Sequence, residues 1–192
     1  MRRKRLVAFI LVFSIVLMGS SVAPDGSDYI MIRGARFNTT LTELSLLNMS
    51  LTDEEIAPLR YMTNLLSLNL DRNQINDITP LAGLINLEVL SLSYNQISDI
   101  TPLAELTDLT FLRLRDNQIS NVSPLTELTN LTHLELDGNP ISDITPLAEL
   151  TNLLTLTLSD NLISDITPLD ELANLSDLHL HDNPHLNPRT GR

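Results

Sequence analysis

Residues 143–164 read DITPLAELTNLLTLTLSDNLIS, and almost the same 22 letters occur before and after them. Their apolar frame is L-x-x-L-x-x-L-x-L-x-x-N-x-I, in which Leu156 and Leu158 alternate with polar residues. This alternation predicts a short strand with both leucines on one face. A single unit cannot bury that face, whereas stacked units bury it against one another. The stretch therefore predicts a repeat array whose core is made by stacking.

The frame recurs without gaps at a step of 22 residues, and an irregular unit with Leu44 and Leu46 precedes it, which gives seven predicted parallel strands. An asparagine follows the strand of each regular unit, and the members of this ladder are Asn73, Asn95, Asn117, Asn139, Asn161 and Asn183. Where the chain turns out of a strand, its backbone N–H and C=O groups lack ladder partners, and a buried carboxamide can satisfy them. The asparagines are therefore predicted to be structural.

The other side of each coil carries Thr or Ser before Pro, as in Thr101-Pro102. This dipeptide predicts an N-cap followed by proline at the first position of a short 3-10 segment. The predicted fold class is an α/β solenoid of the leucine-rich repeat type. A curved parallel β-sheet is expected on the concave face and short 3-10 turns on the convex face.

Four segments are predicted along the chain. Residues 1–23 combine a basic start, a run of 13 residues that is apolar apart from Ser14, and a small-x-small cleavage site ending at Ala23. This is the pattern of a secretory signal peptide. An uncleaved N-terminal anchor is the alternative, although a spanning helix needs about 20 apolar residues. Residues 24–40 are predicted to form an extended N-terminal cap, residues 41–186 the leucine-rich repeat domain, and residues 187–192 a C-terminal tail.

The charge balance limits the classes of partner. After cleavage at Ala23 the chain has eight Arg and no Lys against 24 acidic residues, a formal charge of −16. Nucleic acids and anionic membranes are bound through clustered Lys and Arg, so neither is expected as the main ligand. The chain has no cysteine, so disulfides contribute nothing and stability must come from stacking.

The repeats also carry a family resemblance. Five consecutive matches to (D/N)-(I/V)-(T/S)-P-L-x-x-L-x-x-L-x-x-L-x-L-x-x-N-x-I-(S/N), from Asp77 to about Asn183, resemble the 22-residue repeats of the internalins and similar exported bacterial proteins. The resemblance covers roughly residues 41–186. It implies a right-handed superhelix, binding of protein partners through the concave sheet, and a secreted or cell-surface location. The helical cap, immunoglobulin-like domain and sorting signal of larger internalins are not visible here, so host-cell invasion is not among the expectations.

The outward positions of the strands vary between repeats, whereas the frame does not. The larger residues among them and at the rim gather in adjacent repeats, and they are Val89, Tyr94, Phe111, Arg113, Arg115 and His133. Binding surfaces concentrate their energy in exposed aromatic and arginine side chains, so this group is predicted to contact a protein partner. The alternative is that Arg113 and Arg115 merely pair across the sheet with Glu135 and Asp137. Exposed pairs of this kind contribute about 0 to 1 kcal/mol each, and the grouping would then be accidental.

No motif indicates catalysis, because nucleophile elbows, phosphate loops and paired acids are all missing. Asp177, His179 and His181 alternate on one strand, but two histidines and a carboxylate on a rigid strand are a poor tetrahedral set, and an exposed polar face is the preferred interpretation. The aspartates recurring at one coil position, Asp77, Asp99, Asp143 and Asp165, are explained by capping or turn formation. We therefore expect neither a metal nor a cofactor.

The sequence as a whole predicts an exported leucine-rich repeat module that binds a protein partner through its concave sheet face and is not an enzyme. The alternative function is a structural spacer, or a fragment of a larger cell-surface protein. Variation of the outward positions favours binding, since a spacer would be expected to show identical faces.

Overall fold

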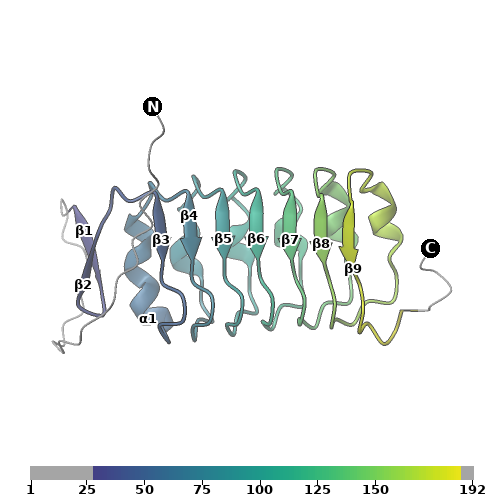
Figure 1. Ribbon diagram of the computed structural model, residues 1–192, viewed down its shortest axis with the longest axis horizontal. Coiled ribbons are helices and arrows are strands. Elements are labelled where there is room, and N and C mark those ends of the chain that lie inside the picture. Colours follow the sequence, from purple (N-terminus) through teal and green to yellow (C-terminus); the bar gives the residue numbers. More distant parts are fainter. Residues whose placement is uncertain (1–27, 187–192) are drawn as a thin grey trace.

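The computed structural model describes residues 28–186, which form a solenoid around a seven-stranded parallel sheet (Figure 1). The strands follow one another in chain order: β3 (Glu43–Ser45), β4 (Ser67–Asn69), β5 (Val89–Ser91), β6 (Phe111–Arg113), β7 (His133–Glu135), β8 (Thr155–Thr157) and β9 (Asp177–His179). Equivalent leucines lie side by side, as Leu134 does beside Leu156. The predicted leucine-rich repeat fold, with its parallel sheet, is confirmed. The predicted signal peptide, residues 1–23, and the C-terminal tail, residues 187–192, lie outside the described residues.

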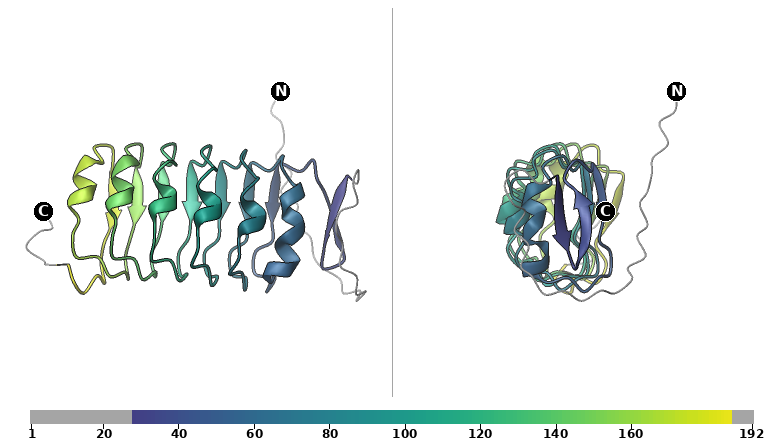
Figure 2. Two further views of the ribbon diagram at one scale, coloured as in Figure 1. Left: turned by 180° about the vertical axis from the view of Figure 1, so that it is seen from behind. Right: turned by 90° about the vertical axis from the view of Figure 1, so that its left-hand side faces the viewer.

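Short 3-10 segments occupy the side of the molecule opposite the sheet (Figure 2). They are η1 (Ala57–Tyr61), η2 (Thr79–Leu81), η3 (Thr101–Leu103), η4 (Ser123–Leu125), η5 (Thr145–Glu149) and η6 (Thr167–Glu171). The core fills the space between the two layers, and the strand leucines Leu112, Leu134 and Leu156 are fully buried. Each repeat therefore buries its leucines against its neighbours, as the frame requires.

The five 3-10 segments that start with Thr-Pro or Ser-Pro, η2 to η6, begin differently from the sequence prediction. In η3, Thr101 is the first residue of the segment rather than its N-cap, and Ile100 occupies the N-cap position without a side-chain hydrogen bond. The carboxylate of Asp99 instead accepts hydrogen bonds from the Thr101 amide at 2.8 Å and from its hydroxyl at 2.6 Å. Thus the recurring aspartate, not the threonine, forms the turn that starts the segment.

A β-hairpin covers the N-terminal end of the array. Strands β1 (Tyr29–Ile32) and β2 (Ala35–Asn38) pair in antiparallel fashion, and they bury Ile30, Ile32 and Phe37. Arg33 in the hairpin turn donates to Glu55 Oε1 at 2.6 Å and to the carbonyl of Met49 at 2.5 Å. Glu55 belongs to helix α1 (Asp53–Ile56), so these bonds tie the hairpin to the first repeat.

Two asparagine ladders run along the solenoid. The ladder identified in the sequence is buried: Asn139 Oδ1 accepts the amide of Ile119 at 3.0 Å, and its Nδ2 donates to the carbonyls of Leu114 and Leu136, both at 3.0 Å. A second ladder, which the sequence analysis missed, is exposed. Its side-chain amides each donate to a carbonyl of the preceding repeat, and its members are Asn64, Asn86, Asn130, Asn152 and Asn174.

Within residues 28–186, no helix has the length and apolar character needed to cross a membrane.

Candidate functional site

The sheet face carries most of the residues that were predicted to bind a partner. We define the aromatic patch as Val89, Phe111, Arg113, Arg115 and His133. Strand register places Val89 beside Phe111 and Phe111 beside His133, so three neighbouring strands contribute to one continuous surface. Since the side chains of a strand alternate between faces, the same register that buries Leu90, Leu112 and Leu134 turns these residues outward.

Phe111 is the centre of the patch. Its ring stacks on the imidazole of His133 with the centroids 5.3 Å apart and the planes inclined by 25°, and the guanidinium of Arg113 lies 4.7 Å from its centroid. The side-chain oxygen of Thr132 lies 2.9 Å from Nδ1 of His133. Phe111 is half-buried, and His133 and Arg113 hold its ring in place before any partner arrives.

The ion pairs of the alternative interpretation are also present. Arg113 Nε lies 3.0 Å from Glu135 Oε1, and Arg115 Nε lies 3.3 Å from Asp137 Oδ2. However, the two arginine side chains remain 42% and 44% exposed. The pairs therefore orient both guanidinium groups across the sheet but leave their surfaces accessible, so cross-strand pairing and partner binding are compatible.

Tyr94 lies apart from the other predicted residues, at the rim where the chain leaves strand β5. It is 40% exposed, and its ring is covered by Arg72 of the preceding repeat, whose Cζ lies 4.3 Å from the ring centroid. Arg72 and Tyr94 form what we call the rim pair. The backbone connects this pair to the aromatic patch, because the amide of Tyr94 donates to the carbonyl of Arg115 at 2.8 Å.

Arg72 was missed by the sequence analysis, although the repeats contain a signal for it. The residue before each buried-ladder asparagine adopts a positive φ angle. These residues are Arg72, Tyr94, Asp116, Gly138, Asp160 and Asp182. Glycine and aspartate accommodate this conformation more readily than arginine or tyrosine, for which it costs about 1 kcal/mol. Comparing this position between repeats would have distinguished both members of the rim pair.

One carboxylate of the sheet face has an altered proton affinity. Burial raises the pKa of Asp71, an effect opposed by a hydrogen bond of 2.7 Å from the amide of Ser93 and by the charge of Arg113. Asp137, three repeats later, has the same type of backbone contact, a bond of 3.0 Å from the amide of Ser159, and its carboxylate also accepts a hydrogen bond from the hydroxyl of Thr157. These bonds fix both carboxylates on the sheet face, where Asp137 also pairs with Arg115.

Asp177, His179 and His181 form an exposed polar edge. His179 Nε2 lies 3.1 Å from Asp177 Oδ1, and the two imidazole centroids are 6.2 Å apart. Among residues 28–186, no three histidines or carboxylates are arranged to hold a metal ion.

Comparisons with known proteins identify the repeats. Residues 85–127 and 107–149 match the family described as Leucine Rich repeats (2 copies), and residues 61–78 match the family Leucine Rich repeat. A search of curated proteins found no match.

The solved structures include internalins. An internalin (InlF) from Listeria monocytogenes is 31% identical, with a TM-score of 0.64, over 78% of this chain and 52% of that one, so the chain spans about half its length. Internalin C2 from the same organism is 34% identical, with a TM-score of 0.55, over 78% of this chain and 87% of that one. The plant peptide hormone receptor RGFR1, in a structure with RGF2, is 25% identical, with a TM-score of 0.63, over 75% of this chain and 25% of the receptor. The repeat frame, the parallel sheet and the match to most of internalin C2 together show that this chain belongs to the internalin-type family of bacterial leucine-rich repeat proteins.

Proposed function

We propose that the protein is an exported binding module that recognises a protein partner through its sheet face, with Phe111 at the centre of the contact. Leucine-rich repeat proteins generally mediate protein–protein interactions. Export is supported by the signal-peptide pattern of residues 1–23 and by the likeness to internalins.

The stack around Phe111 is the observation that carries this proposal. A half-buried aromatic ring between an imidazole and a guanidinium loses little conformational freedom on binding, and rigid groups of this kind form the energetic centres of interfaces. The stack also has no role in the leucine core, because Phe111 points away from Leu112. A residue chosen only for folding at this position would be as small and polar as Thr155 in the corresponding place two repeats later.

A receptor with the same fold supports the same mode of action. RGFR1 was solved in complex with RGF2 and shares the fold of this chain. From this likeness we infer that the repeat array of this chain serves as a binding surface. We do not transfer the identity of the ligand.

Site-specific photo-cross-linking tests the proposal directly. A benzophenone amino acid is placed at Phe111, and a matched control carries it at Glu105, an exposed residue on the opposite side of the same solenoid. We expect cross-links to one partner from position 111 and none from position 105 when the protein is exposed to the surface components of its host cell or environment. A Phe111→Ala variant should keep its melting temperature and lose capture of that partner.

Cross-linking with equal yield from both positions, or from neither, would refute recognition by the sheet face. The second of these results is the one expected of a structural spacer.

A further inference from the structure

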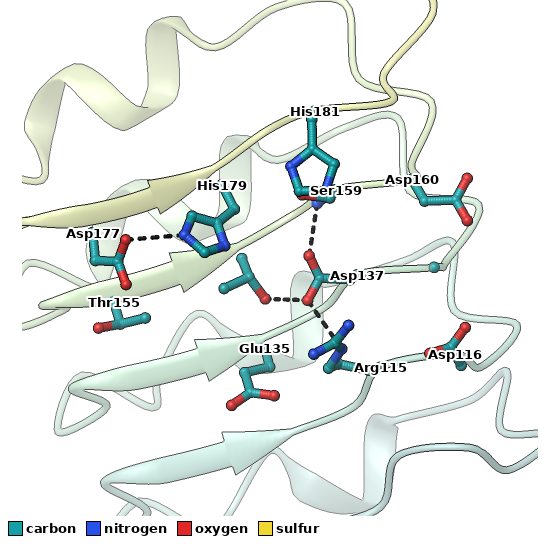
Figure 3. A pocket seen from close by; sticks show the side chains of 12 residues that line it. Arg115, Asp116, Glu135, Asp137, Thr155, Ser159, Asp160, Asp177, His179 and His181 are labelled. Carbon is teal, nitrogen blue, oxygen red and sulfur yellow. Dashed lines mark hydrogen bonds and ion pairs between the residues drawn. The ribbon is translucent and has the colours of Figure 1, made fainter.

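A hollow of about 400 Å³ lies on the C-terminal half of the sheet face, next to the aromatic patch (Figure 3). Small side chains form its floor, namely Thr155, Thr157 and Ser159. Larger side chains stand on both sides, with Arg115 and Glu135 towards the patch and His179 and His181 towards the last strand. The hollow thus arises because a repeat with short outward residues is placed between repeats with long ones.

The inner polar groups of the hollow are satisfied by one another. Asp137 accepts hydrogen bonds from the Thr157 hydroxyl and the Ser159 amide and pairs with Arg115. On the opposite side, Ser159 Oγ lies 2.9 Å from His181 Nδ1. These contacts hold the walls in position, so the shape of the hollow does not depend on an occupant.

Two carboxylates at the rim differ from this pattern. The side chains of Asp116 and Asp160 have no hydrogen-bond or ion-pair partner among residues 28–186. They occupy corresponding positions in alternate repeats, and Gly138 occupies that position in the repeat between them. A Cβ atom at Gly138 would lie 2.8 Å from Asp116 Oδ1, which places that carboxylate over the glycine. The glycine therefore leaves room for the Asp116 carboxylate to lie across the repeat between Asp116 and Asp160.

We propose that this hollow receives an arginine side chain of the protein partner, with its guanidinium between the Asp116 carboxylate, which covers Gly138, and the Asp160 carboxylate. The inference rests on the proposed binding function of the sheet face. The hollow is lined by five carboxylates and one guanidinium, so its field favours a cation. A guanidinium is planar and offers N–H donors along more than one edge, so it can bind two carboxylates at once.

A peptide titration followed by NMR tests the hollow without knowledge of the partner. The probe is acetyl-Gly-Gly-Arg-Gly-Gly-amide, and its control is the same peptide with citrulline, which keeps the shape of arginine but lacks its charge. With ¹⁵N-labelled protein we expect the arginine peptide to shift the amide signals of Gly138, Ser159 and Asp160, and the citrulline peptide to leave them unchanged.

Two variants locate the effect. Asp116→Asn combined with Asp160→Asn keeps the side-chain shape at positions where asparagine tolerates positive φ, and it should weaken binding of the arginine peptide roughly tenfold. Asp182→Asn is the matched control, because Asp182 has the same backbone conformation but does not line the hollow. It should leave the affinity unchanged.

Equal shifts with both peptides, equal affinity in the double variant, or no shift at the hollow would each overturn the proposal. These results are independent of the cross-linking at Phe111, so the hollow can fail while recognition by the sheet face stands. The opposite result can also be recognised. If the arginine peptide binds but position 111 gives no cross-links, the hollow is a binding site and the aromatic patch is not.

Discussion

Asn139→Ala tests how much the buried asparagine ladder stabilises the solenoid. The substitution leaves the amide of Ile119 without a partner. It also removes the Asn139 hydrogen bonds to the carbonyls of Leu114 and Leu136, which still accept from Asn117 and Asn161. Asn139 is only 3% exposed, so solvent reaches these groups poorly. Each buried group left unsatisfied costs about 1 to 3 kcal/mol, and partial relaxation of the turn recovers some of this. The unpaired amide and the loss of one donor at each carbonyl should lower the free energy of unfolding by about 3 kcal/mol.

Urea denaturation followed by circular dichroism measures this loss, and Asn152→Ala provides the matched control. Asn152 belongs to the exposed ladder and makes one bond of 2.8 Å, to the carbonyl of Thr129, which water can replace. The control should lose no more than about 1 kcal/mol. Losses of equal size in the two variants, or a loss below about 1 kcal/mol for Asn139→Ala, would refute the argument that burial makes the first ladder decisive.

Two further predictions concern polar positions of the coil. Asp108 interrupts the exposed ladder, because a carboxylate cannot donate to the carbonyl of Ile85 as Asn130 donates to that of Thr107. Asp108→Asn should therefore raise the free energy of unfolding by about 0.5 kcal/mol, measured as a higher midpoint of urea unfolding. An unchanged or lower midpoint would show that asparagine at this position does not add a stabilising bond to the exposed ladder. Hydrogen bonds from the hydroxyl and amide of the threonine two residues later lower the pKa of Asp77, Asp99, Asp143 and Asp165 below the ordinary value of 3.8. The stability that these bonds provide is present above pH 3.8 and is lost as the pH falls through the lowered pKa. Asparagine can accept the same bond, as Asn121 does from the amide of Ser123. Changing all four aspartates to asparagine should therefore make the free energy of unfolding fall less steeply as the pH is lowered. A fall as steep as in the unmodified protein would show that these aspartates do not cause the loss of stability in acid.

The repeat frame determined most of the fold, because the positions of its leucines and asparagines allow one way of stacking. Strands, register and the placement of the ladder followed from the spacing alone. The start of the 3-10 segments η2 to η6 was predicted wrongly by one residue, because Thr101 satisfies both the N-cap rule and the Asx-turn geometry set by Asp99. Local propensity did not distinguish these two arrangements, since both place Pro102 in the first turn.

The candidate site was less accessible to sequence reasoning. Outward positions could be read from the alternation, and this identified Phe111 and its neighbours as a group. The hollow could not be predicted, because it depends on the relative length of side chains in three successive repeats and on the rotamers that Asp137 fixes. The residues of strand β8 looked uninformative in the sequence since they are small, yet their small size creates the floor of the hollow.

The rim pair links stability to recognition. Arg72 and Tyr94 adopt positive φ at a cost of about 1 kcal/mol each, whereas glycine at this position would avoid it. The stacking of Arg72 on Tyr94 returns about 0.5 to 1 kcal/mol, so the pair gives the solenoid no net stability over a Gly or Asp pair. The pair changes the surface, because it adds a partly exposed aromatic ring at the rim, on a residue whose backbone amide is bonded to Arg115 of the aromatic patch. A position that costs stability and adds an exposed ring is better explained by partner binding than by folding, and we infer that the contact surface extends from Phe111 to this rim.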